Sequence, residues 1–252
     1  MRRPAPYLTL GLAALLLAPA AAACQQAAEP SRVPAPRRVL FLGNSLTYYN
    51  DLPEAVAGIA LAAGAPLAVG TVAAPNFGLI DHLAEGSAAR AALAAGGWDV
   101  VVLQQGPTTL PANRDSLVLW TRMLDTLIRA AGARPALFMV WPVMGQEGGF
   151  AAVEASYRAA ALAVDGSFLP AGVAWKLALE PDPTLALYGP DGFHPSPLGT
   201  FLAALAIYEG LTGRDVRTFS PPPVVDGTRL ALSESTLRLL QEAAHRANAR
   251  RN

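Results

Sequence analysis

The sequence predicts an α/β fold in which helices cover both faces of a parallel sheet. Short apolar runs alternate along the chain with longer segments rich in Ala and Leu, the pattern of strands joined by crossover helices. The runs are continuously apolar, which is typical of strands buried on both faces. The chain has 252 residues and is 52% hydrophobic, so it is long and apolar enough for one domain with a sizeable core.

Each predicted strand is a short apolar run beside a turn residue. The run 38–42 ends at Gly43, and 99–104 is the clearest strand because it contains three consecutive valines. Several helical segments stop at glycines, such as Gly64 and Gly132. The predicted strands are 38–42, 67–73, 99–104, 135–141 and a short fifth at 168–173. The predicted helices are 52–63, 79–95, 116–131, 151–163, 196–211 and 233–249.

The first 23 residues are typical of a secretory signal peptide. Arg2 and Arg3 form a positive start, and the apolar run 7–23 ends in small residues. The alternative is a membrane-spanning anchor, which needs about 20 apolar residues. The run is short for that role and Pro19 interrupts it. We therefore expect residues 1–23 to be cleaved and the protein to be exported, to the periplasm or cell envelope.

Cys24 is the only cysteine, so no internal disulfide is expected. The segment 17–24 resembles a bacterial lipobox, in which the cysteine becomes the lipidated N-terminus, although Ala21 stands where the pattern prefers Leu. The alternative is ordinary cleavage with Cys24 incidental. We expect lipidation of Cys24, a Pro-rich tether over 24–37 and a folded domain over 38–252. Membrane contact is expected only through this anchor.

The charge pattern argues against a nucleic-acid partner. Acidic and basic residues balance at 19 each, and no basic stripe stands out. No cluster of His, Cys and carboxylate residues has the spacing of metal ligands along the sequence. We therefore expect no metal and no cofactor.

Polar residues follow the predicted strands at the point where each ends. In open parallel sheets, ligands bind beyond the carboxyl ends of the strands, so these segments are the expected site. The segments are Gly43-Asn44-Ser45, Pro75-Asn76-Phe77-Gly78, Gln104-Gln105-Gly106 and Trp141-Pro142.

Ser45 is the candidate nucleophile because it directly follows the first strand. A serine hydroxyl needs an adjacent base to react. The alternative is that Ser45 or Asn44 only caps a helix. His194 is the candidate base, since it lies in the loop 188–197, which is dense in turn residues. Asp191, three residues earlier, could orient the imidazole, and the alternative for Asp191 is a turn-forming role.

The two other histidines are weaker candidates. His82 lies in a predicted helix beside leucines, and we expect it to be packed or at the surface. His245 lies among charged residues of the last helix, and we expect it to be exposed to solvent.

Two motifs together resemble the SGNH, or GDSL, hydrolases. Gly43-Asn44-Ser45-Leu46-Thr47 is similar to block I of that family, and Asp191-Gly192-Phe193-His194-Pro195 is similar to block V. They occur in the order that the family uses, and the resemblance covers about 38–213. It implies a three-layer α/β/α sandwich with a flavodoxin-like sheet, and the hydrolysis of esters.

The resemblance also implies roles for single residues. Ser45 would be the nucleophile, His194 the base and Asp191 its orienting partner. The backbone N–H groups of Ser45 and Gly78 would bind the oxyanion.

The third family block departs from its usual pattern. The family has an asparagine after the third strand, whereas this chain reads Leu103-Gln104-Gln105-Gly106. A glutamine carries the same amide donor, so Gln104 or Gln105 could replace the asparagine, and we prefer Gln105. The alternative is that both glutamines satisfy backbone groups. Asn44 stands where block I usually has Asp, and we expect only an indirect effect.

These residues predict a serine esterase that acts on carboxylic esters by two-step acyl transfer. Acetyl or short acyl esters, including those on glycans, are the expected substrates. One alternative is a lipase or lysophospholipase, with an apolar groove lined by Phe77, Leu79, Trp141 and Phe193. A second is a non-catalytic, glycan-binding envelope lipoprotein. A third is a purely structural lipoprotein with no organised pocket beside Ser45.

Overall fold

The computed structural model describes Met1 and residues 35–250, and residues 36–250 belong to one compact unit. The predicted signal peptide, Cys24 and the tether up to residue 34 lie outside the described residues. In the part of the chain that the structure describes, no helix combines the length and apolar character needed to cross a membrane.

The core of this unit is a five-stranded sheet in which all neighbouring strands pair in parallel, in the order β2-β1-β3-β4-β5. The strands are β1 (Arg37–Gly43), β2 (Leu67–Ala73), β3 (Val100–Leu103), β4 (Arg134–Phe138) and β5 (Ser167–Leu169). Val39–Gly43 and all of β3 are buried, because helices cover both faces of the sheet. The predicted three-layer α/β/α fold is confirmed.

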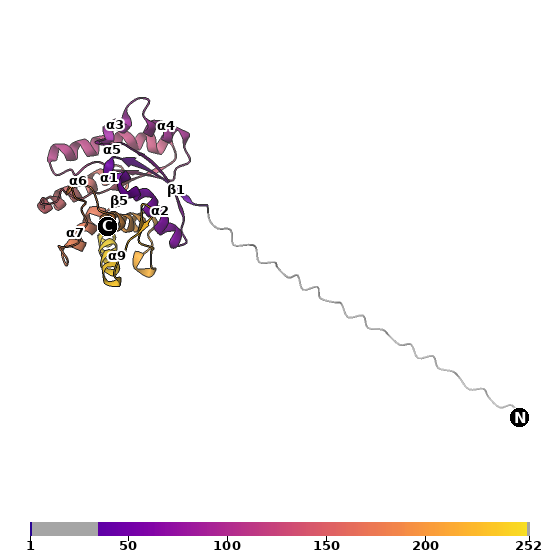
Figure 1. Ribbon diagram of the computed structural model, residues 1–252. Coiled ribbons are helices and arrows are strands. Elements are labelled where there is room, and N and C mark those ends of the chain that lie inside the picture. The colour runs from indigo at the N-terminus through magenta and orange to yellow at the C-terminus, as the bar shows by residue number, and fades with distance from the viewer. Residues whose placement is uncertain (2–34, 251–252) are drawn as a thin grey trace. The chain divides into compact units, whose positions relative to one another are not determined.

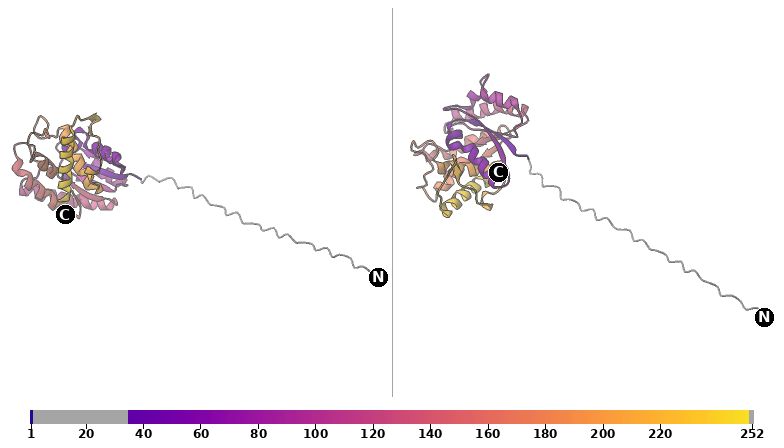
Figure 2. Two further views of the ribbon diagram at one scale, coloured as in Figure 1. Left: turned by 90° about the horizontal axis from the view of Figure 1, so that it is seen from below. Right: turned by 45° about the vertical axis from the view of Figure 1, so that its right-hand side comes forward.

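The helices form the two outer layers. They are α1 (Ser45–Tyr48), α2 (Leu52–Ala62), α3 (Leu79–Leu83), α4 (Ala88–Ala95), α5 (Pro111–Ala130), α6 (Phe150–Leu162), α7 (Ala171–Leu179), α8 (Pro197–Thr212) and α9 (Glu234–Ala249). In Figure 1, α3, α4 and α5 lie over one face of the sheet, and α2 and α9 lie on the other. Helix α8 packs between α2 and α9, and α6 packs beside α5. Figure 2 shows the same layers from two further directions.

Three elements differ from the sequence-based expectation. The helix predicted over 79–95 is two helices, because Gly86 adopts a left-handed φ of 74° and Ser87 caps α4 through its side chain. Helix α5 begins at Pro111, five residues early, since proline is well suited to the first helical turn. Helix α7 was not predicted and follows β5 directly, so the fifth strand is shorter than expected.

Short elements complete the fold outside the main sheet. They are the 3₁₀ turns η1 (Tyr49–Asp51), η2 (Glu147–Gly149) and η3 (Val216–Thr218), and a small antiparallel pair, β6 (Val224–Val225) and β7 (Thr228–Arg229). Because the five main strands run parallel, their carboxyl ends meet at one edge of the sheet. The segments after β1, β2 and β3 therefore come together at that edge.

Candidate active site

The turn after β1 presents Ser45 at the first residue of α1. Asn44 is the helix N-cap: its Oδ1 accepts a hydrogen bond from the Leu46 N–H at 3.1 Å, and its Nδ2 donates to the Phe77 carbonyl at 2.9 Å. The capping role therefore belongs to Asn44, and the Ser45 hydroxyl is left for another partner. Asn44 also joins the β1 turn to the loop after β2.

Gln104 supports this turn from below. Its Oε1 accepts hydrogen bonds from the Asn44 N–H at 2.9 Å and from the Thr47 hydroxyl at 2.7 Å, and its Nε2 donates to the Gln105 carbonyl at 2.7 Å. A Cβ on Gly43 would lie only 2.5 Å from the Gln104 Oε1, so only glycine fits there. The Gln104 side chain thus bonds groups inside the fold. This agrees with the alternative in which the glutamines satisfy backbone groups.

The loop before α8 is closed on itself and carries the candidate base. Tyr188 and Pro195 form an isolated antiparallel bridge, and Gly192 adopts the left-handed φ of 67° that the turn requires. The Asp191 Oδ1 accepts hydrogen bonds from the backbone N–H groups of Phe193 at 3.0 Å and His194 at 2.9 Å. Asp191 therefore shapes the loop as well as contacting the imidazole.

The structure brings Ser45, His194 and Asp191 together in one line. The His194 Nε2 lies 2.8 Å from the Ser45 Oγ, although the two residues are 149 positions apart. The His194 Nδ1 lies 2.6 Å from the Asp191 Oδ2. The hydrogen bond from the His194 imidazole, with that from the Phe193 N–H, lowers the pKa of the Asp191 carboxyl to about 2. Asp191 is therefore ionised at neutral pH.

The expected oxyanion donors are only partly free. The Gly78 N–H was expected to be free to bind the oxyanion, but it donates to the Asp81 Oδ2 at 2.8 Å. The Gln105 Oε1 accepts from the Leu79 N–H at 3.0 Å, and its Nε2 has no protein partner among the described residues. The Ser45 N–H is likewise unpaired within the described part of the chain, as is common at the start of a helix.

A pocket of about 410 Å³ opens beside Ser45. Besides Ser45, five polar residues line it, namely Asn44, Asn76, Gln105, Thr108 and Asn113. Three aromatic side chains also line it, namely Phe77, Trp120 and Phe193. A larger groove of about 670 Å³ lies over α4 and α5, but neither Ser45, His194 nor Asp191 borders it. The pocket at Ser45 is therefore the candidate active site.

Only two of the four residues expected to line an apolar groove for a lipase reach the pocket. Leu79 and Trp141 are completely buried and do not reach the pocket. The Trp141 ring stacks on Trp175 at a centroid distance of 3.6 Å, and its Nε1 donates to the Phe193 carbonyl at 3.2 Å. Trp141 thus supports the His194 loop from the core, whereas Phe77 and Phe193 do line the pocket.

No protein-family model and no curated protein sequence match the chain. A candidate SGNH hydrolase from Slackia heliotrinireducens is 26% identical, with a TM-score of 0.61 over 70% of this chain and 100% of that one. The chain has the SGNH hydrolase fold. The family resemblance inferred from the two sequence motifs is confirmed.

Other solved structures agree on the fold. A DUF4886 family protein from Bacteroides uniformis is 19% identical, with a TM-score of 0.69 over 84% of this chain and 95% of its own. The psychrotrophic esterase EstA from Pseudoalteromonas sp. is 16% identical, with a TM-score of 0.51 over 70% of this chain and 97% of its own. These two neighbours share the fold of the chain.

His82 has a packing role in this SGNH fold. It is buried, so of the two positions expected from the sequence, packed or at the surface, it occupies the packed one. Its Nε2 donates to the Gly43 carbonyl at 2.9 Å. Burial lowers the pKa of the His82 imidazole, so the neutral form is favoured. His82 therefore holds the last carbonyl of β1 in place, directly before the turn that carries Ser45.

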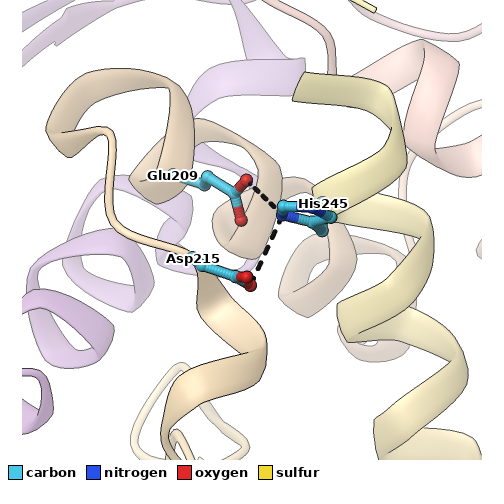
Figure 3. A group of neighbouring side chains, drawn as sticks. All are labelled: Glu209, Asp215 and His245. Atoms are coloured by element: carbon cyan, nitrogen blue, oxygen red, sulfur yellow. Dashed lines mark hydrogen bonds and ion pairs between the residues drawn. The ribbon is translucent and has the colours of Figure 1, made fainter. Parts of the chain in front are cut away.

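The expectation that His245 is exposed was wrong. Its Nδ1 lies 2.8 Å from the Glu209 Oε1 and 3.4 Å from the Asp215 Oδ1, as Figure 3 shows. These three residues form the one group in the described chain with the composition and spacing of a metal site. Each carboxylate already has protein partners, because Arg217 pairs with Asp215 and the Val216 N–H bonds Glu209. The group joins α9 to α8 and η3.

Two contacts near the base were not predicted. The Tyr49 ring stacks on His194, and the Asn50 side chain donates a hydrogen bond to the carbonyl of Pro195, the residue after His194. Both residues follow Ser45 closely in the sequence, but no local pattern indicates where their side chains point. Trp120 and Asn113 were also missed, since they reach the pocket from α5, far from either motif.

Proposed function

We propose that this chain is a serine ester hydrolase with Ser45 as nucleophile, His194 as general base and Asp191 as the residue that orients His194. The observation that carries the proposal is the unbroken line of two hydrogen bonds, 2.6 Å and 2.8 Å long, that joins the three side chains. Nucleophile, base and orienting group within hydrogen-bond reach are the geometric signature of nucleophilic catalysis.

The mechanism is acyl transfer in two steps. The Ser45 Oγ attacks the ester carbonyl carbon while the His194 Nε2 accepts the hydroxyl proton. When the tetrahedral intermediate collapses, that proton passes to the leaving alcohol and the acyl group stays on Ser45. A water molecule then attacks the acyl carbon while His194 accepts one of its protons. When the second tetrahedral intermediate collapses, the bond to the Ser45 Oγ breaks, His194 returns the proton to that oxygen, and the carboxylic acid is released. Ionised Asp191 stabilises the imidazolium in both steps.

The oxyanion is best served by the Ser45 N–H and the Gln105 Nε2. Both donors lie at the pocket and neither is paired in the described chain. The Gly78 N–H can join them only if Asp81 releases it, since its present acceptor is the Asp81 carboxylate. Gln105 thus supplies the amide donor that the family places on asparagine.

The lining of the pocket favours short acyl esters of polyhydroxylated alcohols, such as acetylated glycans. The amide side chains of Asn76, Gln105 and Asn113 can donate and accept hydrogen bonds with sugar hydroxyls. Trp120 and Phe193 offer aromatic faces beside them. No Leu, Ile, Val or Met lines this pocket in the described chain, so its apolar surface comes from aromatic rings beside polar side chains and not from an aliphatic groove for a long acyl chain.

The Ser45→Ala variant tests the proposal with p-nitrophenyl acetate as substrate. We expect wild-type protein to hydrolyse the ester and to be labelled by a fluorophosphonate probe, and the variant to do neither. Ser116→Ala is the matched control, because Ser116 is a half-buried residue of α5 that does not line the pocket, and its hydroxyl donates to the Ala112 carbonyl. Unlabelled wild-type protein that still bound acetylated glycans would support the non-catalytic alternative instead.

Export and lipidation at Cys24 belong to the same proposal. An enzyme anchored outside the cell would meet acetylated glycans of the envelope or the surroundings. The support is the sequence alone, namely the positive start, the apolar run and the sole cysteine. Expression of wild type and Cys24→Ala, followed by membrane fractionation, tests it: only the wild type is expected in the membrane fraction.

A further inference from the structure

We infer that Tyr49 and Asn50, in the turn that follows the nucleophile helix, are positioning residues for the base His194. The inference rests on the proposed function, because it assigns a purpose to contacts around the proposed base. Neither residue belongs to the line of hydrogen bonds from Asp191 to Ser45. Both act on the imidazole or its loop from the side of the nucleophile.

Tyr49 fixes the plane of the imidazole. The rings of Tyr49 and His194 are stacked, with centroids 4.5 Å apart and an angle of 20° between their planes. The hydrogen bonds to Asp191 and Ser45 are made by the two different nitrogens of the imidazole, Nδ1 and Nε2. They fix the positions of these nitrogens, but they only weakly resist rotation of the ring about the line that joins Nδ1 to Nε2. A ring packed against the face opposes that rotation, which keeps the Nε2 lone pair aimed at the hydroxyl.

The same stack favours the imidazolium that forms during catalysis. The face of a tyrosine ring is negative and attracts a cation lying over it. Asp191 is the charged side chain in contact with His194 in the described part of the chain, and it acts in the ring plane. Phe193 meets the imidazole edge-on at 5.1 Å. Tyr49 therefore adds stabilisation to the protonated base across the face of its ring.

Asn50 ties the turn to the loop of the base. Its Nδ2 donates to the Pro195 carbonyl and to the Thr200 hydroxyl, each at 2.9 Å. Pro195 directly follows His194, so this amide joins the nucleophile segment to the backbone beside the base. Asn50 and Asp51 both adopt left-handed backbone angles, with φ of 52° and 53°. Such a conformation in two successive non-glycine residues is unfavourable by itself, and the bonds of Asn50 hold it in place.

Three variants at neighbouring positions test the role of Tyr49. Tyr49→Leu removes the aromatic face, Tyr49→Phe keeps it, and Tyr48→Leu is the matched control. Tyr48 and Tyr49 are adjacent and equally exposed, at 39%, but only Tyr49 stacks on His194. We expect Tyr49→Leu to lower kcat for p-nitrophenyl acetate by roughly 5- to 50-fold with little change in KM, because misplacing reacting atoms costs up to about 100-fold.

The conservative variants and the pH profile separate positioning from a general loss of structure. Tyr49→Phe and Tyr48→Leu should keep kcat within about twofold of wild type, since the stack remains. In Tyr49→Leu the acid side of the kcat/KM profile should move to lower pH, because the protonated imidazole loses its stabilising face. Asn50→Gly, which tolerates the left-handed angle but lacks the amide, should lower kcat without raising KM.

The outcomes distinguish this inference from the proposed function. Wild-type protein that hydrolyses the ester in a Ser45-dependent way, with unchanged kcat and pH profile in Tyr49→Leu, would overturn the inference and leave the function standing. An equal loss in Tyr48→Leu would also overturn it. Wild-type protein with no hydrolysis and no fluorophosphonate labelling would overturn both.

Discussion

The side-chain oxygen of Gln105 accepts a hydrogen bond of 3.0 Å from the Leu79 backbone N–H. This contact orients the amide, because an amide oxygen held on one donor leaves the nitrogen to face elsewhere. The side chain of the neighbouring Gln104 is buried, and it makes two hydrogen bonds to the turn that carries Ser45 and one to the Gln105 carbonyl. Two adjacent glutamines therefore have different tasks, and their variants should behave differently.

Gln105→Leu should lower kcat by about 10²–10³-fold, the usual effect of removing one oxyanion donor, with a small change in stability. Gln104→Leu should instead lower the free energy of unfolding by about 1–3 kcal/mol, because the buried Asn44 N–H and Thr47 hydroxyl lose their acceptor. Ester hydrolysis and urea denaturation of both proteins measure the two effects. The opposite pattern would assign the amide donor to Gln104.

Asp191→Asn should lower kcat by about 10⁴-fold, because the neutral amide neither holds the reactive tautomer nor stabilises the imidazolium. The pKa of Asp191 is depressed to about 2, so this carboxylate stays ionised through any assay between about pH 5 and 9. Protonation of Asp191 should therefore not cause the loss of activity on the acid side. A pH profile of kcat/KM in which a carboxyl of ordinary pKa controlled the acid side would contradict this.

Acyl chain length should decide between the esterase and the lipase. We expect acetyl and butyryl p-nitrophenyl esters to be hydrolysed with a higher kcat/KM than octanoyl esters, because polar side chains line the pocket at Ser45. Trp120→Ala should weaken the hydrolysis of acetylated oligosaccharides more than that of p-nitrophenyl acetate, which is too small to need an aromatic platform. A clear preference for octanoyl esters would favour the lipase.

Stability should fall as the pH drops because of His82. Burial lowers the pKa of this imidazole in the folded state, whereas the unfolded chain takes up a proton near the ordinary value of about 6.5. The unfolded state therefore binds more protons below that pH, and the free energy of unfolding decreases there. His82→Gln keeps a donor for the Gly43 carbonyl but does not titrate. Its stability should change less than that of wild type between about pH 7 and 5, as measured by urea denaturation.

Much of the fold was predictable because its signals are local. The run 38–42 and the valines of 99–104 are continuous apolar segments, and only strands buried on both faces need that pattern. The break between α3 and α4 was missed because Gly86 looks like any other glycine until its φ is known. Helix α7 was missed because it directly follows the fifth strand and continues its apolar character.

The site was predictable in its members but less so in its contacts. Short motifs around Ser45 and His194 were sufficient to name the three side chains that hydrogen bonds join in the structure, because each motif places particular residue types in a particular order. They were insufficient for Gly78, whose N–H meets Asp81, and for Trp141, which packs in the core. Those outcomes depend on which side chain fills the space beside a group, and the sequence pattern carries no such information.

The sequence by itself determined the α/β class, the order of the two motifs along the chain and the identity of the three residues proposed for catalysis. Only the tertiary structure decided that Gln105 and not Gln104 faces the pocket, that Tyr49 covers the imidazole and that His245 is paired rather than exposed. The reason is physical. Hydrophobic pattern and turn chemistry act between near neighbours, whereas these contacts join segments far apart in the chain and exist only once the core is packed.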